Sequence, residues 1–276
     1  MIKKILVISF IFSILGVCAQ LVTSTAQPPG ALVQNVLLGP GVTVSNISYT
    51  GSPGAIGFFD GTNTNLGIAQ GIVMTTGTVL NNGSGPHGPN NSANSGVDNG
   101  VGGSGLLGAV VGATTFNAAT LEFDFIPYSD TVRFRYVFGS EEYTDNSGFI
   151  NYQCSSYNDK FGFLISGPGI SGEAGYTNDA RNIARLDNGS EVSINSVNSG
   201  VVGSSGGSPN ASRCSSVNPS WVQNNATAEF LGTIDGTQLN GNTRILTAKQ
   251  SGLTPGATYH IKLIVMDISD GAYDSV

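Results

Sequence analysis

The stretch "ATLEFDFIPYSDTVRFRYVFGSEEY", residues 119–143, decides the fold. Apolar and polar residues alternate in it twice, first around Phe123 and then around Phe134. Successive side chains of a β-strand point to opposite faces, so Leu121, Phe123 and Phe125 share one face while Glu122 and Asp124 share the other. The pattern predicts two strands, each with one face against a core and one face towards water.

Short runs of the same kind recur along the chain, separated by turns rich in Gly and Asn. We expect further strands within residues 42–51, 55–61, 71–81, 160–167, 191–197, 243–250 and 259–269. The one helical pattern is a turn or two at residues 31–38. Many short strands predict an all-β fold, an antiparallel β-sandwich with jelly-roll character. Long Gly/Asn/Ser-rich loops are expected at residues 81–112 and 195–225.

The composition narrows the function classes. Charged residues make up 11% of the 276 residues, and the formal net charge is −7. With no basic patch, nucleic acid is excluded as a partner, and attraction to anionic lipid is disfavoured.

The first residues predict export. Lys3 and Lys4 precede an apolar run that is too short to span a membrane, which is typical of a signal peptide at residues 1–19. Cleavage before Gln20 leaves a single domain, 20–276, with no transmembrane segment. Lipidation of Cys18 is the alternative, although Val17 fits it poorly. At the other end a new apolar strand begins just before Val276, so we expect the domain to be truncated at its C-terminal strand.

Cys154 and Cys214 are the cysteines that remain after signal cleavage, and both lie in Ser/Asn-rich segments. Cysteine pairs of exported proteins are commonly bonded, so a disulfide between them is predicted. It would close a loop of about 60 residues and add about 2–4 kcal/mol of stability.

Acidic residues stand at the ends of the predicted strands. Glu141 and Glu142 are adjacent, so simple alternation cannot expose both, and the buried one needs a cation such as Arg133, Arg135 or a metal ion. Oxygen ligands from separate loops suit Ca²⁺. The candidate calcium ligands, expected near one end of the sandwich, are Glu141, Glu142, Asp159, Asp267, Asp270 and Asp274. The alternative is that these acids cap loops and face water.

Several motifs resemble the choice-of-anchor L domain. They are "YVFGSEEY", "NDKFGFLISGPG", "NIARL" and "TYHIKLIVMDISDGAYDSV", with "LEFDFIP" and "GIVMTTG" earlier in the chain. The resemblance covers the whole mature chain. It implies a secreted or cell-surface protein of the kind found above all in Bacteroidetes and related bacteria, attached only if a C-terminal anchor follows. It also implies an acid where this chain has Asn117.

Three functions are open. The leading one is a non-enzymatic module for adhesion, binding a glycan or surface protein and stabilised by calcium. Its support is the set of aromatic residues near loops, namely Tyr143, Tyr152, Tyr157, Tyr176 and Trp221. The second is a secreted glycan-active hydrolase that uses paired carboxylates such as Glu122 and Asp124. The third is a structural spacer. His87 and His260 are assigned structural roles, and no catalytic residue is singled out.

Overall fold

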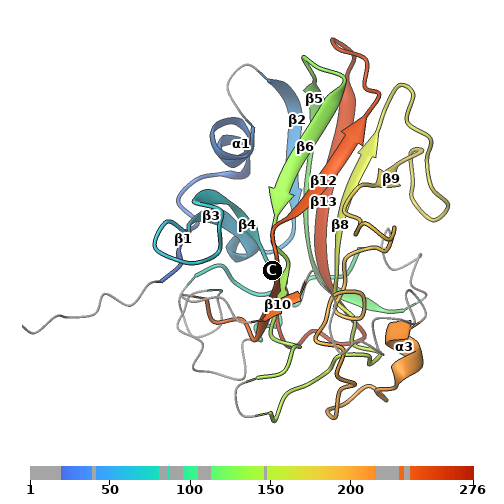
Figure 1. Cartoon of the computed structure of the whole chain (residues 1–276). Coiled ribbons are helices and arrows are strands. Elements are labelled where there is room, and N and C mark those ends of the chain that lie inside the picture. The colour runs from blue at the N-terminus through green and yellow to red at the C-terminus, as the bar shows by residue number, and fades with distance from the viewer. Residues whose placement is uncertain are drawn as a thin grey trace, which may run out of the picture.

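The computed structural model describes residues 20–38, 42–80, 86, 96–104, 113–145, 148–215, 230–232 and 237–276. Every strand pair within these residues is antiparallel, and the strands form packed layers (Figure 1). The all-β sandwich predicted from the sequence is therefore confirmed. The expected signal peptide with Cys18, and likewise His87 and Trp221, lie outside the described residues.

The main layer is a five-stranded sheet in the order β2-β5-β13-β8-β9. Its strands are β2 Thr43–Thr50, β5 Thr115–Ile126, β13 Tyr259–Ile268, β8 Lys160–Ser166 and β9 Arg181–Asn182. The register of β13 against β5 shifts between Val265 and Asp267. An irregularity of this kind changes the direction in which the neighbouring side chains point, and here the neighbouring residue is Asp267.

The second layer is built from smaller pieces that cover the sheet. The pair β6 Thr131–Tyr136 and β12 Leu246–Ser251 crosses in front of β5 and β13 (Figure 1). Beside it lies the sheet of β1 Val22–Ser24, β3 Ile56–Asp60 and β4 Gln70–Met74. Three short helices accompany this sheet, the α-helix α1 Pro29–Leu32, the π-helix η1 Val33–Leu37 and the 3-10 helix η2 Pro53–Ala55. A third small sheet holds β7 Gly139–Ser140, β11 Gly241–Thr243 and β10 Phe230–Gly232, and α3 is Ala211–Ser215.

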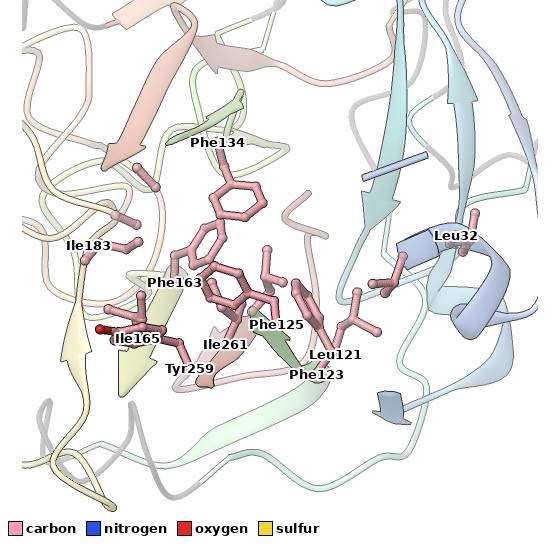
Figure 2. Packing of buried hydrophobic residues seen from close by; sticks show 14 of the residues in the cluster. Leu32, Leu121, Phe123, Phe125, Phe134, Phe163, Ile165, Ile183, Tyr259 and Ile261 are labelled. Atoms are coloured by element: carbon pink, nitrogen blue, oxygen red, sulfur yellow. The ribbon is translucent and has the colours of Figure 1, made fainter. Parts of the chain in front are cut away.

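Aromatic side chains fill the space between the layers. Phe134 of β6 meets Phe163 of β8 with ring centroids 4.7 Å apart, and Figure 2 shows them among the inward residues of β5 and β13. Phe123 is fully buried, as the alternation predicts. A buried side chain of this size contributes about 1.5–3 kcal/mol, so the layers are held chiefly by apolar burial.

Two strand predictions are wrong in detail. Residues 191–197 form only isolated bridges, Arg185 with Glu191 and Lys160 with Ser193. The hydroxyl of Ser196 accepts from the Ser193 N–H and donates to the Glu191 carbonyl, so local side-chain bonds replace the ladder. The strand expected to end near residue 81 ends at Met74, since the next residues bond the segment before β3.

Candidate functional site

Acidic residues gather at one end of the sandwich. Glu141 and Glu142 follow β7, Asp159 precedes β8, and Asp267 lies near the end of β13, so antiparallel neighbours bring them together. These four and Asp274 are each 1% exposed or less, whereas Asp270 is half-buried. We call these six acids and Asn117 the carboxylate cluster. Both adjacent glutamates are buried because they lie in a turn, where strand alternation does not apply.

Hydrogen bonds join the cluster to the C-terminal segment. Asp159 Oδ1 accepts from the N–H of Ile268 at 2.9 Å, and its Oδ2 accepts from the Ser275 hydroxyl at 2.8 Å. Asn117 Nδ2 donates to Asp267 Oδ2 at 3.0 Å. The N–H of Val97 lies 3.2 and 3.3 Å from the two oxygens of Asp274. The cluster therefore fastens residues 267–275 to three other parts of the chain.

Glu142, Asp267 and Asn117 each have one buried side-chain oxygen without a hydrogen bond from any described residue. These oxygens are Glu142 Oε2, Asp267 Oδ1 and Asn117 Oδ1. A buried acceptor left unsatisfied costs about 1–3 kcal/mol, and more when it carries charge. Such groups in a native protein call for an explanation such as an ion or a water molecule.

Burial and mutual repulsion act on these acids in the same direction. Burial, followed by the charges of Asp267 and Asp270, raises the pKa of Glu142 well above its ordinary value. Burial raises the pKa of Asp267 to about 7 despite its hydrogen bonds. Burial and the charge of Asp267 raise the pKa of Asp274 to about 8. The cluster is thus unfavourable in its charged form unless positive charge enters it.

Two basic side chains that precede the cluster acids or lie beside them in sequence have other partners. Lys160 pairs with Glu191 at 3.1 Å, and Arg135 donates to the carbonyl of Gly67. The possibility that Arg133 or Arg135 neutralises the glutamates is wrong, because both arginines are exposed on β6. No ion pair within the described residues involves Glu142, Asp159 or Asp267. In the same part of the chain, no three His, Cys, Asp or Glu side chains are poised to hold a metal as they stand.

A group of tyrosines adjoins the cluster. Tyr152 contacts Tyr157 edge-on with centroids 5.3 Å apart, and it contacts Tyr273 at 5.1 Å. All three are partly exposed, and the charge of Asp270 acts on Tyr152. We call Tyr152, Tyr157, Tyr273 and Asp270 the tyrosine surface. Sequence reasoning missed Tyr273, whose backbone has a φ of 66°, because no local pattern predicts that left-handed turn.

The other aromatic residues of the sequence hypothesis lie apart from this surface. Tyr143 is fully buried, and its hydroxyl donates to the carbonyl of Val197. The Tyr176 hydroxyl bonds Glu191. Both residues have structural partners, so they do not add to a binding face.

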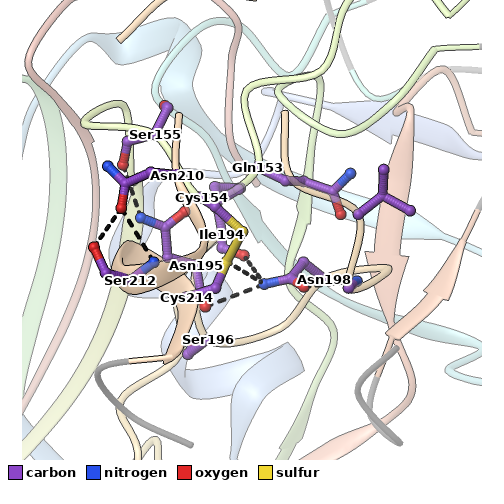
Figure 3. The surroundings of a disulfide bond; sticks show 12 residues. Gln153, Cys154, Ser155, Ile194, Asn195, Ser196, Asn198, Asn210, Ser212 and Cys214 are labelled. Atoms are coloured by element: carbon purple, nitrogen blue, oxygen red, sulfur yellow. Dashed lines mark hydrogen bonds between the residues drawn. A yellow bond between two sulfur atoms is a disulfide. The ribbon is translucent and has the colours of Figure 1, made fainter. Parts of the chain in front are cut away.

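The predicted disulfide is confirmed and stands beside the tyrosine surface. Cys154 and Cys214 are bonded with their Cα atoms 5.0 Å apart. Figure 3 shows Asn198 beside the bond, where its amide donates to the carbonyls of Ile194 and Asn195. The bond ties the segment that carries Tyr152 and Tyr157 to the segment that ends in α3.

Glu122 and Asp124 of β5 are paired with side chains of the neighbouring strand β13. His260 Nδ1 lies 2.7 Å from Asp124 Oδ1, and its Nε2 lies 3.1 Å from Glu122 Oε2. Lys262 pairs with Glu122 at 3.0 Å. These contacts join β5 to β13 through their side chains, which agrees with a structural role for His260.

A cavity of about 360 Å³ lies between the layers. Its walls are mainly apolar, with Met74, Phe134 and Phe161 among them. The charged residues among its described lining are Arg133 and Arg135, and none of the cluster acids contributes. The cavity is separate from the carboxylate cluster.

The fold and the buried acids describe a β-sandwich module stabilised at one end by its C-terminal segment. The choice-of-anchor L domain profile matches residues 21–276, so this chain belongs to the choice-of-anchor L domain family. That membership implies an extracellular or cell-surface protein. Comparisons with curated proteins and with solved structures returned no match. Among the described residues, no helix has the length and apolar character needed to cross a membrane.

Proposed function

We propose that this domain is a non-enzymatic module of the cell exterior that binds carbohydrate through the tyrosine surface. The observation that supports the proposal is the gathering of Tyr152, Tyr157 and Tyr273 beside Asp270 at the loop end of the sandwich. Tyrosine presents a broad apolar ring and a hydroxyl, which suits a partner that is apolar on one side and polar on the other.

Carbohydrate is the partner whose chemistry fits this surface best. A pyranose ring has a C–H face that can lie on an aromatic ring, and its hydroxyls can donate to the half-buried carboxylate of Asp270. Tyrosine also loses little conformational entropy on binding, since it has only two side-chain torsions. The disulfide and the hydrogen bond from Ser269 to the Ser156 carbonyl hold the surface in place before a ligand arrives.

A glycan array followed by calorimetry on the best ligand tests the proposal. We expect Tyr152→Ala and Tyr273→Ala to weaken binding at least about tenfold, because each removes a central contact. Tyr128→Ala is the matched control, since Tyr128 is 72% exposed at the opposite end of β5 and should leave affinity unchanged. Equal effects of all three variants would contradict the proposed surface.

Hydrolysis assays on the bound glycan address the alternative enzyme. Turnover that Glu122→Gln or Asp124→Asn abolishes would favour the hydrolase with paired carboxylates. Neither binding nor turnover across the array would favour the structural spacer.

A further inference from the structure

We infer that the carboxylate cluster binds one Ca²⁺, with Glu142, Asp267 and Asn117 as its central ligands. The inference does not rest on carbohydrate binding, because the ligands lie beneath the tyrosine surface and are buried. The ion fastens the C-terminal segment, residues 267–275, to the turn after β7.

The charge of the cluster calls for a cation. Glu142, Asp159 and Asp267 are buried together, and none of them is in an ion pair with a described residue. Lys160, the base nearest to them in sequence, is held by Glu191. Isolated buried carboxylates are strongly unfavourable, so the cluster needs either protons or a cation.

The uncharged amide of Asn117 also calls for a cation. This residue is 2% exposed, and its Nδ2 donates to Asp267 Oδ2 and to the carbonyl of Gly271. Its Oδ1 has no hydrogen-bond partner among the described residues. A proton shared between acids would leave this oxygen unsatisfied, whereas a cation would use it together with Glu142 Oε2 and Asp267 Oδ1.

The donor atoms select the metal. The three oxygens without partners come from two carboxylates and one amide, and such ligands suit hard cations. Ca²⁺ takes six to eight oxygens in irregular geometry, while Mg²⁺ demands a near-ideal octahedron. Because the side chains do not converge on one point as they stand, binding requires them to turn, and the more tolerant ion is favoured.

Calcium titration of the full mature chain after EDTA treatment tests the inference. We expect calorimetry to give one ion per chain and a melting temperature about 5–10 °C higher when free calcium is a hundredfold above Kd. An equal concentration of magnesium should give a smaller shift. No heat of binding in millimolar calcium, with the same melting temperature as in EDTA, would overturn it.

Two variants separate an ion site from a structural hydrogen-bond network. Glu142→Gln removes one repelling charge, so we expect a higher melting temperature in EDTA but calcium affinity weakened at least about tenfold. Asn117→Asp adds a charged ligand, so it should lower the melting temperature in EDTA and tighten calcium binding. Asp130→Asn, in the exposed turn before β6, is the control that should change neither. Calcium affinity unaltered by both cluster variants would place the ion elsewhere.

Discussion

At the scale of single residues, the buried carboxylate of Asp274 leaves no room for a side chain at Gly77. A Cβ built on Gly77 would lie 1.8 Å from Asp274 Oδ2, so no larger residue fits while that carboxylate stays in place. We expect Gly77→Ala to lower the free energy of unfolding by about 2 kcal/mol or more through this overpacking.

Denaturant unfolding measures that effect against a matched glycine. Gly30 of α1 has open space around its Cβ position, so Gly30→Ala should be neutral or add about 0.5–1 kcal/mol. A Gly77→Ala variant as stable as the parent would show that the Asp274 carboxylate can move freely.

The ionised side chain of Glu191 contributes to the stability of the fold. Burial opposes its ionised form, yet the Tyr176 hydroxyl and the charges of Lys160 and Arg185 outweigh that and lower its pKa. We expect Glu191→Gln to destabilise the fold by about 1–3 kcal/mol, because Lys160 would lose its partner while half-buried. Asp130→Asn, in the exposed turn before β6, should stay within about 0.5 kcal/mol in the same denaturant titration.

At the scale of elements, the disulfide holds one loop against another. Replacing Cys154 and Cys214 by serine should cost about 2–5 kcal/mol, since the unfolded chain regains the freedom of a long loop. Thermal unfolding of this double variant measures the loss. Because both cysteines lie outside the aromatic core, we expect its far-ultraviolet circular dichroism to stay close to that of the parent below the transition.

The strands that alternate could be predicted from the sequence, and those held by side chains could not. Phe123 and Ile261 each sit in a run whose period matches a half-buried strand, and β5 and β13 form there. Residues 191–197 have a similar composition, but Ser193 and Ser196 bond each other instead of a neighbouring strand. Local hydrogen bonding of this kind depends on the tertiary setting, which the sequence pattern does not contain.

The site was predictable only in part, for a related reason. Placing Glu142 and Asp159 at strand ends needs nothing beyond periodicity. The depth of the turn that buries Glu141, and the left-handed backbone of Tyr273, follow from packing across the whole domain. The acidic residues could therefore be identified from the sequence. Their burial, and the grouping of the tyrosines, could be seen only in the folded structure.

At the scale of the whole molecule, the cluster predicts how stability changes with pH. Asp267 has a pKa of about 7 and Asp274 of about 8 in the folded protein, both above the ordinary value of about 3.9. The folded state therefore holds more protons than the unfolded state between about pH 4 and pH 8, so calcium-free protein should lose stability as pH rises through this window.

Melting temperatures measured in EDTA from pH 5 to pH 8 test this, with calcium as the second arm. Calcium binds the deprotonated carboxylates, so its stabilising shift should grow as pH rises. A melting temperature in EDTA that rises steadily over the same range would contradict the raised pKa values of Asp267 and Asp274.

The position of β13 has a consequence for the order of assembly during synthesis. This strand lies between β5 and β8, yet both of its neighbours leave the ribosome before it does. Until residues 259–268 emerge, β5 and β8 have no partner along their facing edges, and the aromatic core stays open to water. The nascent chain cannot complete the main sheet before β13 has emerged, which makes folding of this domain depend on long-range pairing.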